Sequence, residues 1–116
     1  MKVQIEGQHI RFRIDEEELT CLLLGEPLTM TTQLLHGQCW RFGIAVIDQP
    51  ECNLVHIKEN WILQIPAQSL QDYVSRLPCR EGLEDRLVLP NGSHLMLNFQ
   101  VDVRDSIQQR GPRQRK

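Results

Sequence analysis

The chain has 116 residues, of which 41% are hydrophobic and 24% charged, and its formal net charge is −2. This length suits one domain that buries roughly two-thirds of its unfolded surface, and the ordinary composition excludes a disordered or fibrous protein. No stretch approaches the roughly 18 to 20 apolar residues of a membrane-spanning helix. Residues 1–14 also lack the apolar block of a secretory signal, so we expect a cytoplasmic protein without membrane association.

The first elements follow from an alternating pattern. Residues 3–14 alternate apolar and polar side chains around a turn at Glu6-Gly7-Gln8, which predicts a β-hairpin. Asp15 and the three glutamates after it predict a helix over 16–24, because these carboxylates accept the free amide groups of a first helical turn and suit its positive dipole end. Gly25 ends this helix.

A second hairpin is predicted further along the chain. Leu34 and Leu35 lead to a turn at 36–38 and then to a strand over 40–47. Both faces of this strand are largely apolar, which indicates a central strand that is covered on both sides. Residues 48–51 then break the chain.

After this break the order strand, strand, helix begins again. Residues 54–57 and 61–65 predict a hairpin. Pro66 opens a helix over 67–77, in which the apolar residues recur at helical spacing.

The last predicted hairpin pairs residues 86–89 with 95–103 around Asn91-Gly92, a dipeptide that accepts the backbone angles of a type I′ turn. Apolar positions in the second half follow their counterparts in the first half at two offsets. The offset is 51 residues for the first hairpin and the helix of each half, and 55 residues for the last hairpin of each half. Trp40 and Trp61 occupy apolar strand positions in this alignment, so we expect both to pack in the core.

These patterns predict an α+β fold. Two similar ββαββ halves, about 1–48 and 52–103, form one mostly antiparallel sheet or a partly closed barrel with two helices. Together they make a single domain over 1–103, followed by a tail over 104–116. The first 103 residues hold 8 Lys or Arg against 14 Asp or Glu, whereas the tail holds 5 against 1. The domain is therefore acidic, and the tail is basic and expected to be disordered.

Cysteine and histidine provide the most suggestive spacing for a metal site. His36 with Cys39, and Cys52 with His56, superficially resemble four zinc ligands. If strand 40–47 pairs with residues 52–57, Cys39 and Cys52 lie ~26 Å apart, which is too far for one ion. We therefore predict no metal and no cofactor. Without an export signal, we expect reduced thiols at all four cysteines, which are Cys21, Cys39, Cys52 and Cys79.

Two arginines mark the surface most suited to a ligand or partner. Arg11 and Arg13 share one face of a strand whose other face is apolar. Paired guanidinium groups bind phosphate or carboxylate in a bidentate manner, although they also pair with acidic groups of their own chain. The tail offers a second set of contacts to nucleic acid or an acidic partner, namely Arg110, Arg113, Arg115 and Lys116.

Three functional hypotheses follow, because the sequence contains no phosphate-binding loop of Walker type, no GxGxxG and no HExxH. The leading hypothesis is a non-enzymatic accessory protein or protein-interaction module. The first alternative is a nucleic-acid-associated protein that uses the basic tail. The second is a small-molecule or metal-dependent enzyme. The sequence does not determine the oligomeric state.

The segment Met1–Ile14 resembles the start of an uncharacterised family of short bacterial proteins. Members of that family begin with a Lys-aliphatic-Arg-Ile segment, a Gly-Asn-Ser turn and an alternating Arg-aliphatic-Arg strand before an acidic helix start. Here Gln8-His9 replaces Asn-Ser, and the chain ends basic where the family often ends acidic. The resemblance implies bacterial origin and a shared fold, and it implies no activity.

Overall fold

A computed structural model describes residues 1–78 and 81–102 of the chain. Within these residues it contains two α-helices, eight β-strands and a short 3₁₀ turn at Leu35–Gly37. The helices are α1 (Glu16–Leu23) and α2 (Ala67–Val74). The strands are β1 (Lys2–Glu6), β2 (His9–Ile14), β3 (Leu28–Gln33), β4 (Cys39–Ile47), β5 (Asn53–Ile57), β6 (Asn60–Pro66), β7 (Leu83–Val88) and β8 (His94–Val101).

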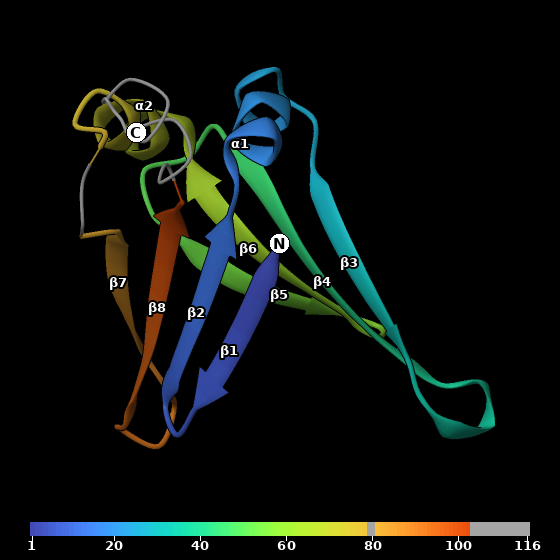
Figure 1. The fold of residues 1–116 in the computed structure, drawn as a ribbon. Helices are drawn as coiled ribbons and strands as arrows, with labels where there is room; N and C mark the ends of the chain where they lie inside the picture. The colour runs from blue at the N-terminus through green and yellow to red at the C-terminus, as the bar shows by residue number, and fades with distance from the viewer. Residues whose placement is uncertain (79–80, 103–116) are drawn as a thin grey trace, which may run out of the picture.

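The strands form two mixed sheets of four strands each. Sheet A has the order β1-β2-β8-β7 and sheet B has the order β3-β4-β6-β5. In each sheet the outer pairings are antiparallel hairpins and the central pairing, β2 with β8 or β4 with β6, is parallel. Figure 1 shows both helices at one end of the two sheets. The α+β class is confirmed.

The prediction of one sheet or a partly closed barrel is wrong. Each helix connects a strand of one sheet to a strand of the other, since α1 joins β2 to β3 and α2 joins β6 to β7. A chain that changes sheet at each helix cannot place all its hairpins in one continuous ladder. Strand β4 consequently lies beside β6. The distance given above between Cys39 and Cys52 rests on a pairing of β4 with residues 52–57, and that pairing is wrong because β5 pairs with β6.

The core lies between the facing sides of the sheets and below the helices. Alternate residues of each strand point into it, as the period of two requires. The largest fully buried side chains come from both sheets and both helices, and they are Tyr73, Phe12, Ile14, Leu22, Ile44, Leu63, Ile65, Leu70 and Leu97. The backbone amide of Val101 donates a 3.0 Å hydrogen bond to the hydroxyl of buried Tyr73, which ties α2 to sheet A.

Both predicted helices are confirmed, and the signals that begin and end α1 are visible in its geometry. Asp15 accepts a 2.8 Å hydrogen bond from the Glu18 amide, and the Glu18 carboxylate accepts one of 3.0 Å from the Asp15 amide. This reciprocal arrangement is a capping box. At the other end Gly25 has a positive φ of 87°, and the amides of Gly25 and Glu26 donate back to Leu22 and Cys21.

Three local predictions are wrong for identifiable reasons. Trp40 is 54% exposed, because it lies near the start of β4 and away from the buried cluster. Leu34 and Leu35 form the tip of the β3–β4 hairpin, and the strand lies earlier, at Leu28–Gln33. In the last hairpin only Gly92 of the Asn91-Gly92 pair has a positive φ, whereas a type I′ turn needs two.

Candidate functional site

The side of sheet A that faces away from the core is polar, and we call it the polar face. It carries the alternate residues of β2 that do not enter the core, together with their neighbours in register on the other strands. These residues are Lys2, Gln4, Glu6, His9, Arg11, Arg13, Glu84, Arg86, Met96, Asn98 and Gln100. The strand alternation thus places Arg11 and Arg13 on one face, opposite buried Phe12 and Ile14.

A hollow of about 300 Å³ lies on the β1–β2 part of this face. Its lining residues are Gln4, Ile5, Glu6, His9 and Arg11. The register explains this grouping, because Gln4 lies opposite Arg11 and Glu6 lies opposite His9.

Polar atoms without partners lie in this hollow and beside it, since His9 and Arg11 line the hollow and Asn98 does not. Among the described residues, Nε2 of His9, Nε of Arg11 and Oδ1 of Asn98 are buried without a hydrogen-bond partner. Asn98 is only 6% exposed, and it lies beside Arg11 in the register of β2 and β8. Buried polar atoms are normally bonded, so the unsatisfied atoms of these three residues call for an explanation, such as a water, an ion or a ligand group that bonds to them.

The two arginines have different surroundings. Arg11 is half-buried in the hollow, whereas Arg13 is exposed and its Nη2 donates to Oε1 of Gln100 at 3.3 Å. Arg13 lines a separate hollow of about 100 Å³ that also contains three carboxylates, those of Asp15, Glu18 and Asp102. Arg13 already has a partner in Gln100, whereas Nε of Arg11 has none, so Arg11 is the better candidate for binding an anion.

Two residues of this candidate site were missed by sequence reasoning. His9 carries a signal that could have found it, because it lies two residues before Arg11 and therefore on the same strand face. Asn98 carries no such signal, since it reaches the site through the parallel pairing of β2 with β8. The predicted tail contacts Arg110, Arg113, Arg115 and Lys116 lie outside the described residues.

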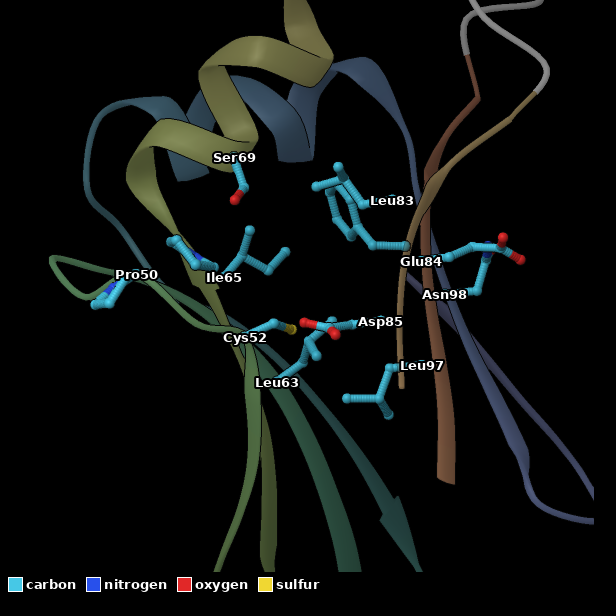
Figure 2. Close-up of a pocket in the computed structure, with 12 residues that line it drawn as sticks. Pro50, Cys52, Leu63, Ile65, Ser69, Leu83, Glu84, Asp85, Leu97 and Asn98 are labelled. Atoms are coloured by element: carbon cyan, nitrogen blue, oxygen red, sulfur yellow. The ribbon is translucent and has the colours of Figure 1, made fainter. Parts of the chain in front are cut away.

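A third hollow, of about 90 Å³, lies between the sheets, where the edge strand β7 faces the start of β5. Figure 2 shows Cys52 and Asp85 pointing toward each other in this hollow, while Glu84 and Asn98 point away from it. Burial, followed by the negative charge of Asp85, raises the pKa of the Cys52 thiol to about 11. A thiol that keeps its proton at neutral pH is a poor nucleophile, so this hollow does not resemble a cysteine active site.

The four residues whose spacing resembles that of zinc ligands, His36, Cys39, Cys52 and His56, are distributed over sheet B and its connections. Cys39 donates a hydrogen bond from its thiol to Oε2 of Glu59 at 3.3 Å, and this bond, with burial, raises its pKa. His56 stacks on Trp61 with ring centroids 3.8 Å apart, and His36 lies at the hairpin tip. Over residues 1–78 and 81–102 no group of three or more His, Cys, Asp or Glu side chains is arranged to hold a metal ion.

Comparisons with known proteins add one finding. A model of a protein family described as a family of unknown function (DUF7009) matches residues 1–106. No curated protein and no solved structure shows a significant match to the chain. In the described part of the chain, no helix has the length and apolar character needed to span a membrane.

Proposed function

The chain belongs to DUF7009, a family of unknown function, and on that premise we propose that it is a non-enzymatic protein-interaction module. In this proposal the polar face of sheet A binds an acidic segment of a partner protein. Arg11 and His9 provide the contacts to a carboxylate, and Asn98 accepts a hydrogen bond from the partner's backbone.

The unsatisfied atoms at the hollow are the observation that carries the proposal. A buried donor or acceptor that loses its partner costs about 1–3 kcal/mol, so Nε of Arg11 and Nε2 of His9 gain from an oxygen acceptor at this position. A carboxylate suits both, because it accepts several hydrogen bonds and carries the charge complementary to a guanidinium. Hydrogen bonds of this charged kind contribute about 1.5–3 kcal/mol each.

A comparison between the two sheets supports a binding role for these side chains. We propose that the chain consists of two repeated halves, and the supporting observation is that β1, β2 and α1 each begin 51 residues before β5, β6 and α2. In that alignment Arg11 corresponds to Ile62 and His9 corresponds to Asn60. The fold therefore does not itself require a guanidinium or an imidazole at these positions of the strand.

A binding experiment tests the proposal. Nuclear magnetic resonance titration of the labelled protein with a hexaglutamate peptide at low salt is expected to shift the amide signals of Gln4, His9 and Arg11. Arg11→Gln is expected to weaken this binding by about tenfold or more, the equivalent of one charged hydrogen bond.

Arg86→Gln is the matched control. Arg86 lies on the same face, in β7, and does not line the hollow, so the substitution removes the same charge and leaves the lining of the hollow unchanged. It is expected to weaken binding less than Arg11→Gln does. Equal losses for the two variants, or no shift of these signals by hexaglutamate, would refute the proposed site.

The basic tail favours a second candidate function, association with nucleic acid. Residues 104–116 hold five Lys or Arg and one Asp. Such binding is expected to weaken steeply with salt and to disappear when the chain is truncated after Val103. Binding of an oligonucleotide that survives this truncation contradicts the tail hypothesis.

A further inference from the structure

Sheet B has an edge strand that lacks the usual protection against pairing. Strand β3 reads Leu-Thr-Met-Thr-Thr-Gln, contains no charged residue, proline or glycine, and lies at the end of its sheet. Figure 1 shows it along one side of the molecule. Natural proteins commonly protect exposed edges with charges, prolines or bulges, because unpaired backbone groups bind other strands.

Two of the other three edge strands, β1 and β7, carry charged residues, whereas β5 (Asn-Leu-Val-His-Ile) resembles β3 in lacking charge, proline and glycine. Strand β1 has Lys2 and Glu6 at its ends, and β7 carries three consecutive charged residues at 84–86. In β7 the Arg86 amide also donates to Oδ1 of Asp85 at 2.9 Å, and in β5 the Leu54 amide donates to Oδ1 of Asn53 at the same distance. Within residues 1–78 and 81–102 no side chain bonds to the backbone of β3.

The pairing of β3 with β4 determines which backbone groups point outward. The Leu34 amide donates to the Gln38 carbonyl at 2.7 Å, whereas the Arg41 amide points to the other side and donates to the Glu59 carbonyl at 3.2 Å. In an antiparallel pair, hydrogen-bonded and non-bonded positions alternate along the strand. Thr31 lies opposite Arg41, so the free groups of β3 belong to Thr31 and to its alternate neighbours Thr29 and Gln33.

We propose that β3 pairs antiparallel with β3 of a second copy of this chain, which joins two copies of sheet B into one continuous sheet. A two-fold axis perpendicular to the sheet keeps inward-facing residues opposite inward-facing residues, which restricts the register. When Thr31 lies opposite the partner's Thr31, Thr29 lies opposite the partner's Gln33. All three outward-pointing residues of β3 then exchange both backbone hydrogen bonds. A shift by two residues in one direction would place Gln33 opposite Pro27, which has no amide to donate.

This register also brings together complementary side chains at both ends of the strand. That complementarity indicates that the strand pairing with β3 comes from a second copy of this chain. It places Leu28 opposite the partner's Leu34 on the inward-facing side, so the exposed leucine at the hairpin tip gains an apolar neighbour. It places exposed Glu26 near the partner's His36, an acidic group beside a basic one. At the centre it forms a Thr–Thr pair, which is favourable across antiparallel strands.

The test combines a charge substitution with a rescue. Light scattering of the full chain is expected to give twice the monomer mass. Thr31→Lys places two ammonium groups opposite each other, close to Arg41 of each copy, and is expected to reduce the mass to that of the monomer. Mixing Thr31→Lys with Thr31→Glu is expected to restore the dimer as a hetero-pair, which mass spectrometry of differently labelled chains detects.

Ile57→Lys serves as the matched control, because Ile57 is an exposed residue on β5 at the opposite edge of sheet B. It is expected to leave the dimer intact. Circular dichroism checks that each variant is folded. A monomeric wild-type chain at its highest soluble concentration, a dimer that survives Thr31→Lys, or a mixture that stays monomeric would each overturn the proposal.

Discussion

At the scale of single residues, strand alternation correctly indicates which side chains leave the core. Arg11 and Arg13 face outward and Phe12 and Ile14 face inward, as the period of two predicts. Alternation alone does not distinguish the half-buried Arg11 from the exposed Arg13. That difference depends on neighbours from β1 and from β8. The residues of β8 in register with β2 lie 87 positions later in the sequence.

Cys52 provides a prediction about pH at this scale. Its pKa is raised from 9.0 to about 11 by burial and by Asp85, so folding disfavours the thiolate. The associated stability is fully present below pH 9 and is lost as the pH rises through about 11. Melting temperatures of the wild-type chain are therefore expected to fall more steeply over this range than those of Cys52→Val. Parallel curves for the two proteins would show that the thiolate is not disfavoured by folding.

At the scale of elements, the sequence predicts the helices better than the strands. The signals of α1 are local, since Asp15 caps it and Gly25 ends it. Strand β3 was missed, although its three threonines favour extended backbone and its apolar residues, Leu28 and Met30, alternate with them. The paired leucines at 34–35 were a stronger apolar signal, and the structure places them in the hairpin tip.

The capping box of α1 gives the prediction for this scale. Asp15→Ala removes the acceptor for the Glu18 amide and is expected to lower the free energy of unfolding by about 1 kcal/mol. Asp15→Asn retains an acceptor oxygen and is expected to cost less. Urea denaturation of the three proteins measures both differences. A result in which Asn and Ala are equally harmful would mean that the charge, and not the cap, stabilises the helix.

At the scale of the whole molecule, each sheet contains one hairpin from each half of the chain. Hairpin β1–β2 pairs with β7–β8, and hairpin β3–β4 pairs with β5–β6. Neither half therefore contains a four-stranded sheet of its own. The inner faces of both sheets contribute to the same buried cluster, so the two halves depend on each other for the core.

This exchange of hairpins predicts how fragments of the chain behave. The fragments 1–50 and 51–116 would each hold isolated two-stranded hairpins, which are marginally stable in water. Each fragment alone is expected to show no cooperative thermal unfolding by circular dichroism, and an equimolar mixture is expected to recover it. A fragment 1–50 that unfolds cooperatively as a monomer is incompatible with the strand order described for the two sheets.

The sequence by itself determined the α+β class, the positions of both helices and the outward orientation of Arg11 and Arg13. These properties depend on a few neighbouring residues, because helix caps and strand alternation act over a single turn or a few positions. Only the tertiary structure decided that there are two sheets, that Asn98 lies beside Arg11 and that β3 has a free edge. Those properties depend on which distant strands become neighbours, and many pairings preserve the same alternation. The packing of the whole core selects among them.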